Sequence, residues 1–331
     1  MSRHTFVAAW LLLAIVPAFA QDAAPDEARA IAKEAYIYGF PMLKSYRIQY
    51  SYFVDKNDKE YKGAWNEIHD SASGSVLGAD LRAEPLVITV PKAGRGHSYP
   101  VQFIDMYTFE FDSLGTKASG SEAGTFLLAG PGWKGEKPAA IKRAIRSETD
   151  FAFVVFRAKA GYKVERLSAF LGKPAAPPAP ALEFPPPSPP DKEHRSPRNF
   201  DLLNFVLRFC PPQPSEAAMR ARFEKIGVVP GKPFDPKMMA VRYKQALKSG
   251  IADAWKAFAE YKATELDTGK VPISARYGTR AAMKAANGDR LYLARMASAE
   301  IGIYENALPI VTRPKVLLFS APVASDDLGV T

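Results

Sequence analysis

The sequence predicts an α+β protein of several domains: an antiparallel, jelly-roll-like β-sandwich with a helical N-terminal lead-in and a helical C-terminal domain. Three observations predict this class. Residues 99–111 alternate apolar and mixed side chains with a period of two, as in a strand with one face against a core. Short apolar runs separated by Gly and Pro continue to about residue 160. Beyond Pro197, apolar residues recur at helical spacing instead.

The chain begins like a cleavable secretory signal. Arg3 and His4 give a basic start, residues 6–16 form an apolar run, and an A-x-A sequence ends at Ala20, as in signal peptides. The run is too short to span a bilayer, which needs about 20 apolar residues. We therefore predict a signal peptide at 1–20, a periplasmic or secreted mature protein and no transmembrane segment in it. An uncleaved anchor or a core helix is the alternative.

Charge and cysteine content exclude several classes of function. The formal net charge of +9 is scattered along the chain, and an exported protein without a basic cluster is not expected to bind nucleic acid. Cys210 is the only cysteine, so an intrachain disulfide is excluded. Because Cys210 follows a segment rich in Leu and Phe, we expect a buried, unreactive thiol.

The lead-in, residues 21–56, is predicted to be mainly helical. Residues 26–46 have a helical composition, and Pro25 suits a first-turn position. Pro41 interrupts the pattern and predicts a kink or break there.

The sandwich is predicted at residues 57–170. Besides 99–111, its strands are expected at 86–90, 125–129 and 151–157, which are rich in β-branched and aromatic residues. Only residues 138–146 look helical in this region. Alternation along 99–111 favours antiparallel pairing, because a parallel strand covered on both faces would be continuously apolar.

A proline-rich linker is predicted at 171–198, because residues 174–190 contain nine prolines and lack the amide donors of a helix or sheet. A ligand for a proline-binding domain is the alternative. A helical domain is predicted at 199–310, and the tail at 311–331 is predicted to be the remnant of a second sandwich. The helices of the helical domain are expected to begin near Asn199, Ser215, Asp235, Asp253 and Asp289, and Gly250 is expected to end the third.

Catalytic and cofactor motifs are missing from the sequence. There is no G-x-S-x-G elbow, no phosphate-binding G-x-x-x-x-G-K-[ST] loop and no βαβ context for a dinucleotide. After signal removal the histidines are His69, His97 and His194, without metal-ligand spacing. We predict neither a cofactor nor a metal centre, although an oxygen-only calcium site stays open.

Asp105 is the one residue that the pattern does not explain. It lies on the apolar face of 99–111, where an unpaired carboxylate is costly. Asp105 is either a structural acid held by loop amides or by a cation, for which Arg157 is the first candidate and Lys117 the second. Alternatively, it is part of a site at the mouth of the sandwich, among Tyr107, Tyr99 and Trp133. Aromatic rings around a carboxylate suit sugar or amine binding.

Three stretches resemble a known family: 34–41 (EAYIYGFP), 84–91 (EPLVITVP) and 99–135, which begins YPVQFIDMYTFEF. Together they are similar to the family of unknown function numbered 1254, over about residues 28–157 and more loosely to 304. The resemblance implies a β-sandwich beside a helical domain, normally followed by a companion sandwich of family 1214, with no agreed activity. Here the companion is largely missing, and residues 70–75 depart from the family's usual Asn-Asp-Thr-Tyr-like motif.

Three functions are compatible with these observations. The first is a ligand-binding or interaction module with a polar pocket at the end of the sandwich. Its candidate residues are Asp105, Tyr107, Lys117, Trp133, Arg157 and His69. The second is a hydrolase that uses Asp105, with His69 or His97 nearby. The third is a truncated relative that retains only the fold. A small-molecule ligand and self-association through the shortened tail are the expected partners.

Overall fold

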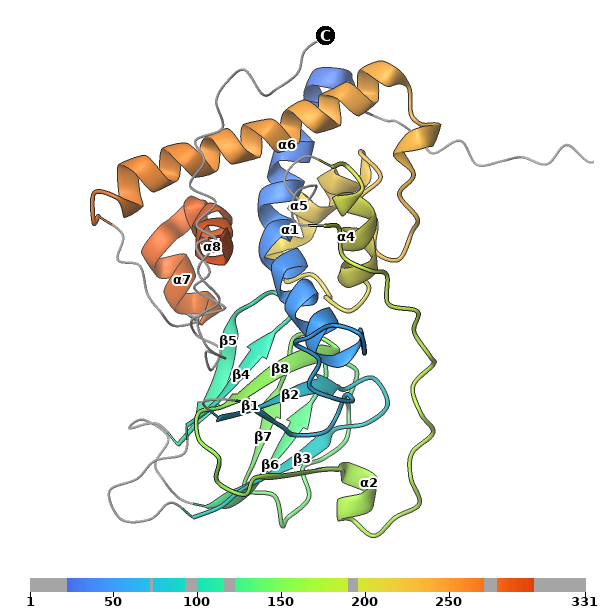
Figure 1. The fold of residues 1–331 in the computed structure, drawn as a ribbon, viewed down its shortest axis with the longest axis vertical. Helices are drawn as coiled ribbons and strands as arrows, with labels where there is room; N and C mark the ends of the chain where they lie inside the picture. Colours follow the sequence, from blue (N-terminus) through green and yellow to red (C-terminus); the bar gives the residue numbers. More distant parts are fainter. Residues whose placement is uncertain are drawn as a thin grey trace, which may run out of the picture.

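The computed structural model describes residues 23–71, 74–92, 100–115, 123–189, 196–270 and 279–300. Within them the chain forms an N-terminal helix, two β-sheets that make a sandwich, and a helical C-terminal region (Figure 1). The predicted α+β class is therefore confirmed. The predicted signal peptide at 1–20, the tail at 311–331 and the candidate residues Tyr99, Lys117, His97 and His194 lie outside the described residues.

Two sheets build the sandwich. The first has five strands in the order β1-β2-β8-β4-β5, all antiparallel, and the second has four in the order β7-β6-β3-β9. The strands are β1 (His69–Ser71), β2 (Gly74–Asp80), β3 (Leu86–Val90), β4 (Val101–Asp105), β5 (Glu110–Leu114), β6 (Gly124–Ala129), β7 (Arg143–Arg146), β8 (Phe151–Phe156) and β9 (Lys163–Arg166). The helix predicted over 138–146 is wrong, because β7 forms there and pairs parallel to β6.

The first sheet is buried on both faces. Leu77, Phe103 and Val154 point into the core between the sheets, whereas Ile104 and Phe153 pack against the helices. This explains why β8 is a continuous apolar run with all six residues buried, although its neighbours are antiparallel.

The prediction of a single strand over residues 99–111 is wrong, because residues 101–111 span parts of two strands. β4 ends at Asp105 and β5 begins at Glu110, so the intervening residues make a turn. The alternation continues beyond β4 because Tyr107 and Phe109 are also buried. They are buried against the helical region and not in the sandwich core.

Helix α1 (Pro25–Phe53) is the centre of the helical region. In Figure 1 it starts above α6, passes behind it and runs down to the sandwich, with α4 and α5 on one side and α7 and α8 on the other. The other helical elements are α2 (Leu167–Phe170), α4 (Asn199–Leu207), η1 (Pro214–Glu216), α5 (Ala217–Glu224), η2 (Pro236–Met238), α6 (Val241–Tyr261), η3 (Lys262–Leu266), α7 (Arg280–Asn287), η4 (Gly288–Arg290) and α8 (Leu291–Glu300). Buried residues of α1, α4, α5, α6 and α8 share one hydrophobic core, whereas α2 packs against the second sheet.

Two helix boundaries differ from the prediction for packing reasons. α1 continues through Pro41, because residues 38–43 are all buried and packing on every side offsets the roughly 3 kcal/mol that an interior proline costs. α6 continues through Gly250, where a Cβ would lie 2.4 Å from the carbonyl oxygen of Arg29. Gly250 therefore marks the close approach of α6 to α1 and not a helix end.

Residues 174–189 form neither helix nor strand, as the proline content predicts. They run along one side of the molecule from α2 towards α4 (Figure 1). In the part of the chain that the structure describes, no helix is both long and apolar enough to cross a membrane.

Candidate functional site at the sandwich–helix junction

The turn between β4 and β5 explains why an acid stands at position 105. The backbone N–H of Thr108 donates to the carbonyl of Asp105 (2.9 Å), and the N–H of Phe109 donates to the Asp105 side chain (Oδ1, 2.8 Å). Aspartate is favoured at the first position of such a turn because its carboxylate accepts from the backbone that follows. Asp105 therefore ends the strand and holds the turn closed.

Thr108 gives this turn a strained backbone. Its φ of 70° lies in the left-handed region that non-glycine residues rarely adopt, at a cost of about 1–3 kcal/mol. Arg295 of α8 donates to both the carbonyl and the hydroxyl of Thr108, and both residues are buried. A helical side chain thus stabilises the conformation of a sandwich turn.

The Asp105 carboxyl group is buried, with 1% of the residue exposed. Its Oδ2 has no hydrogen-bond partner among the described residues. Burial raises the pKa of Asp105 to about 7, with the nearby Glu148 adding to the rise, whereas the Phe109 N–H and the Arg280 guanidinium oppose it. Asp105 therefore holds its proton to a higher pH than an exposed aspartate does.

Charged residues from both parts of the molecule gather beside this turn, and we call them the junction cluster. Its members are Asp105, Glu148, Glu216, Arg220, Arg280 and Arg295. Glu148 precedes β8, whereas Glu216 and the arginines come from the helical region. The cluster therefore joins the sandwich to the helices.

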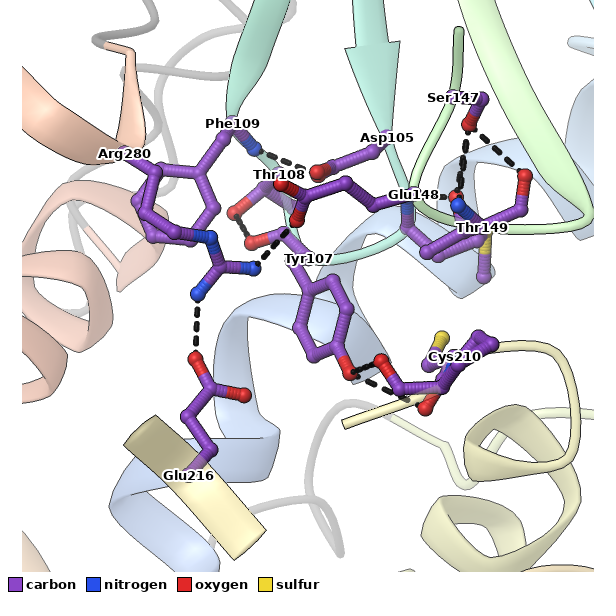
Figure 2. Close-up of polar contacts among 12 residues, drawn as sticks. Asp105, Tyr107, Thr108, Phe109, Ser147, Glu148, Thr149, Cys210, Glu216 and Arg280 are labelled. Carbon is purple, nitrogen blue, oxygen red and sulfur yellow. Dashed lines mark hydrogen bonds and ion pairs between the residues drawn. The ribbon is translucent and has the colours of Figure 1, made fainter. Parts of the chain in front are cut away.

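Arg280 bridges two acids of the junction cluster (Figure 2). Its guanidinium donates to Glu148 (3.0 Å) and to Glu216, and it stacks over the rings of Phe109 (4.4 Å to the centroid) and Tyr107 (4.8 Å). Burial lowers the pKa of Arg280, but Glu216, Glu148 and Asp105 outweigh burial and raise it above the ordinary value. Arg280 stays charged although most of its side chain is removed from water, because acids surround it.

Glu216 is the main buried acceptor of the cluster, with 3% of the residue exposed. Besides Arg280, the hydroxyl groups of Tyr38 (2.9 Å) and Tyr292 donate to it. A buried carboxylate with three donors is well satisfied.

Tyr107 links the turn to the chain that follows α4. Its hydroxyl donates to the carbonyl oxygens of Cys210 (3.0 Å) and Pro211 (2.9 Å), and Arg220 donates to the Tyr107 hydroxyl (3.2 Å) and to the Cys210 carbonyl (2.6 Å). Burial raises the pKa of Tyr107 above its usual range. The Cys210 thiol is buried as predicted, and burial raises its pKa well above the ordinary value.

The cluster has an inner part and an outer edge. The side chains of Glu148 and Arg280 are 34% and 20% exposed, whereas Asp105 and Glu216 lie behind them. The Nε of Arg280 is buried and, within the described residues, also without a hydrogen-bond partner. Asp105 Oδ2 and Arg280 Nε are thus an acceptor and a donor of the cluster that no described residue pairs with.

Of the six candidate residues, the structure brings Asp105 and Tyr107 together. Arg157 donates to Gln102 near the start of β4. Gln102 precedes Asp105 by three residues, which is about 10 Å along a strand. Trp133 packs on the outer face of the second sheet, where Arg146 stacks on it. His69 lies on the edge strand β1 and contacts the carbonyl of Ala64 (2.8 Å).

The sequence reasoning missed the partners of Asp105. Nothing in the local sequence connects Glu148, Glu216 or Arg280 to it, because they lie more than 40 residues away. Arg295 carried a usable signal, since it stands four residues after Leu291 on the buried stripe of α8. Among the described residues, no three His, Cys, Asp or Glu side chains are grouped so that they could hold a metal ion.

Fold and site together define a β-sandwich protein whose helical region closes one end of the sandwich through buried charges. Residues 70–170 match the family model described as "Protein of unknown function (DUF1254)". This part of the chain is a DUF1254 domain, which confirms the predicted resemblance.

The chain is also similar to the VPA0106 protein from Vibrio parahaemolyticus, a structural-genomics target whose crystal structure is known. The TM-score is 0.64 and the sequence identity is 20%, over 85% of this chain and 68% of that chain. At this identity the likeness shows a shared fold. No curated protein matches the chain.

Proposed function

We propose that this chain is a ligand-binding module, that the junction cluster is its site, and that the ligand is a small polar molecule with a hydroxyl group. One observation carries the proposal: Asp105 Oδ2 and Arg280 Nε belong to one cluster, and neither has a hydrogen-bond partner among the described residues. A buried polar atom without a partner costs about 1–3 kcal/mol. A hydroxyl group can accept from Arg280 and donate to Asp105, so its binding recovers this cost.

The electrostatics of the site support a neutral ligand. Three arginines face three acids, Glu148, Glu216 and Asp105, and burial raises the pKa of Asp105 to about 7, so the positive and negative charges of the cluster largely offset each other. A charged ligand would disturb this balance, whereas a polyol or a sugar would not. The partly exposed Glu148–Arg280 pair provides the side from which such a molecule enters.

The secretory character of residues 1–20 supports a location in the periplasm or the medium. Binding there would involve solutes from outside the cytoplasm, which include sugars and polyols.

A thermal-shift screen of the mature protein against monosaccharides, polyols and small amines tests the proposal. A ligand at one hundred times its dissociation constant stabilises the folded state by about 2.7 kcal/mol. We expect at least one sugar or polyol to raise the melting temperature and D105N to abolish the rise. D112N is the matched control, because Asp112 lies on the neighbouring strand β5 and pairs with Arg143.

Two results would contradict the proposal. The first is a panel in which no compound raises the melting temperature. The second is a shift that D105N and D112N leave equally intact. If no compound binds, the third function considered from the sequence, that of a truncated relative that retains only the fold, becomes the better description.

A hydrolase is the second candidate, and one observation favours it. Asp105, with a pKa raised to about 7 chiefly by burial, lies near the more exposed Glu148, and two carboxyl groups in unequal environments can divide acid and base roles. Chromogenic glycosides and esters test this function. Turnover that is lost in both D105N and E148Q would support hydrolysis, whereas no turnover by the wild type would exclude it for these substrates.

A further inference from the structure

The proline-rich segment 174–189, called the strap from here on, covers a second site that is separate from the junction cluster. Phe184 of the strap inserts its ring among three aromatic rings. It stacks on Trp65 (5.8 Å between centroids, 11° between planes) and meets Phe151 (6.0 Å) and Phe205 (5.9 Å) edge-on. We call this space the aromatic pocket.

A small cavity extends the aromatic pocket beyond Phe184. Its volume is about 10 Å³, which is at the lower limit for one water molecule. The residues around it include Tyr46, Gln49, Tyr50, Trp65, Met106 and Phe209. The cavity alone is too small for any organic ligand, so a ligand can enter only where Phe184 now lies.

Two polar atoms of residues around the pocket lack hydrogen-bond partners. The Oε1 of Gln49 and the Nε1 of Trp65 are buried and have no hydrogen-bond partner in the part of the chain that the structure describes. Gln49 is 2% exposed, and its Nε2 already donates to Ser45 (3.0 Å). A ligand with one ring N–H or hydroxyl group could donate to Gln49, which the phenyl ring of Phe184 cannot do.

The strap is held in a way that allows it to leave. Among the described residues, its backbone takes part in no backbone–backbone hydrogen bond. Its carbonyl groups instead accept from three side chains: Tyr46 to Pro185 (2.6 Å), Arg47 to Ser188 (2.5 Å) and Arg82 to Pro180 (2.9 Å). Removing a proline-rich segment breaks no sheet or helix, and such a segment loses little conformational entropy on docking.

We propose that the aromatic pocket binds small planar aromatic molecules that carry one hydrogen-bond donor, and that Phe184 is the lid residue they displace. The ligand ring takes the place of the phenyl ring between Trp65, Phe151 and Phe205, and its donor reaches Gln49. Phe184 and the ligand compete for one space. Only the fraction of molecules in which Phe184 has left the pocket can bind the ligand, so the apparent affinity is lower than the intrinsic affinity by that fraction.

Indole is the probe that tests this inference, because it is planar and has one N–H donor. Isothermal titration of the mature protein should show one weak site. F184A removes the competing ring and should bind indole roughly tenfold more tightly. F170A is the matched control, since Phe170 is a partly buried phenylalanine of α2 that packs against the second sheet, and it should bind like the wild type.

A milder variant guards against misfolding of F184A. Y46F removes only the hydroxyl that anchors Pro185 and keeps the ring in the pocket, so it should also tighten indole binding, by a smaller factor. Wild-type protein that shows no heat of binding up to the solubility of indole would overturn the inference. Equal affinities of the wild type, F184A and Y46F would overturn it as well, because binding would then occur elsewhere.

Discussion

The junction cluster and the aromatic pocket both contact the turn after β4, but different forces hold them together. In the cluster, each buried charge depends on particular partners, as Arg280 depends on Glu148 and Glu216. In the pocket, Phe184 is held by ring contacts that any planar group of similar size could replace. The comparison teaches that the cluster is specific and intolerant of change, whereas the pocket is adaptable.

The largest effect is expected when the cluster loses its main acceptor. E216A removes the buried group to which Arg280, Tyr38 and Tyr292 donate and leaves the partly buried Arg280 short of partners. Breaking a buried ion pair in this way costs about 3–5 kcal/mol. Urea unfolding measures the loss, and E216Q, which keeps an acceptor oxygen, should lose less. A loss below about 1 kcal/mol for E216A, the size of a surface pair, would contradict this view of the cluster.

The next effect concerns pH. Burial raises the pKa of Asp105 from 3.8 to about 7 in the folded state, so the folded state binds more protons than the unfolded state between these values. Stability from this group therefore falls as pH rises from about 4 to 7. D105N lacks this titrating group. The free energy of unfolding of D105N minus that of the wild type should therefore rise between these two pKa values by about 1.4 kcal/mol per pH unit, about 4 kcal/mol in all.

Urea unfolding of both proteins at half-unit steps from pH 4 to 8 measures this difference. D112N, which removes a carboxylate from the neighbouring strand β5, again serves as the control. If the difference in free energy of unfolding between D105N and the wild type is flat from pH 5 to 7, the Asp105 carboxyl group is not buried in the way described here.

The smallest effect is expected in the aromatic pocket. F184A removes a ring that is only partly buried, so the loss in urea unfolding should be about 2 kcal/mol, less than the 3–5 kcal/mol of a fully buried phenylalanine. F103A, in the core between the sheets and fully buried, gives that larger value for comparison. Equal losses for the two variants would mean that the strap is part of the core and not a displaceable cover.

Sequence reasoning predicted those elements whose cause is local. β3 and β8 are short runs of β-branched and aromatic residues, and their bounds match the prediction to within a residue. The turn after β4 was missed because Tyr107 and Phe109 keep the alternation of a strand, while their burial comes from helices far along the chain. The continuous α1 and α6 were missed for the same reason, since Pro41 and Gly250 are tolerated only in their tertiary surroundings.

The candidate site divides in the same way. The abnormal position of Asp105 was visible in the sequence because a lone acid interrupted an apolar pattern. The surroundings of Asp105 could not be predicted in this way, because Arg280 and Arg295 come from helices roughly 180 residues later. Arg157 was the nearest cation in the pattern, but it binds Gln102 because the register of β4 and β8 places it opposite Pro100, away from the end of β4.

A direct test of the buried acid at the junction is the titration of the Asp105 carboxyl carbon by NMR, with D105N to assign the signal. We predict a midpoint near pH 7, about three units above an ordinary aspartate. A midpoint below about pH 5 would show that water or a firm partner stabilises the carboxylate, and the proposed site would then lose the group on which it is built.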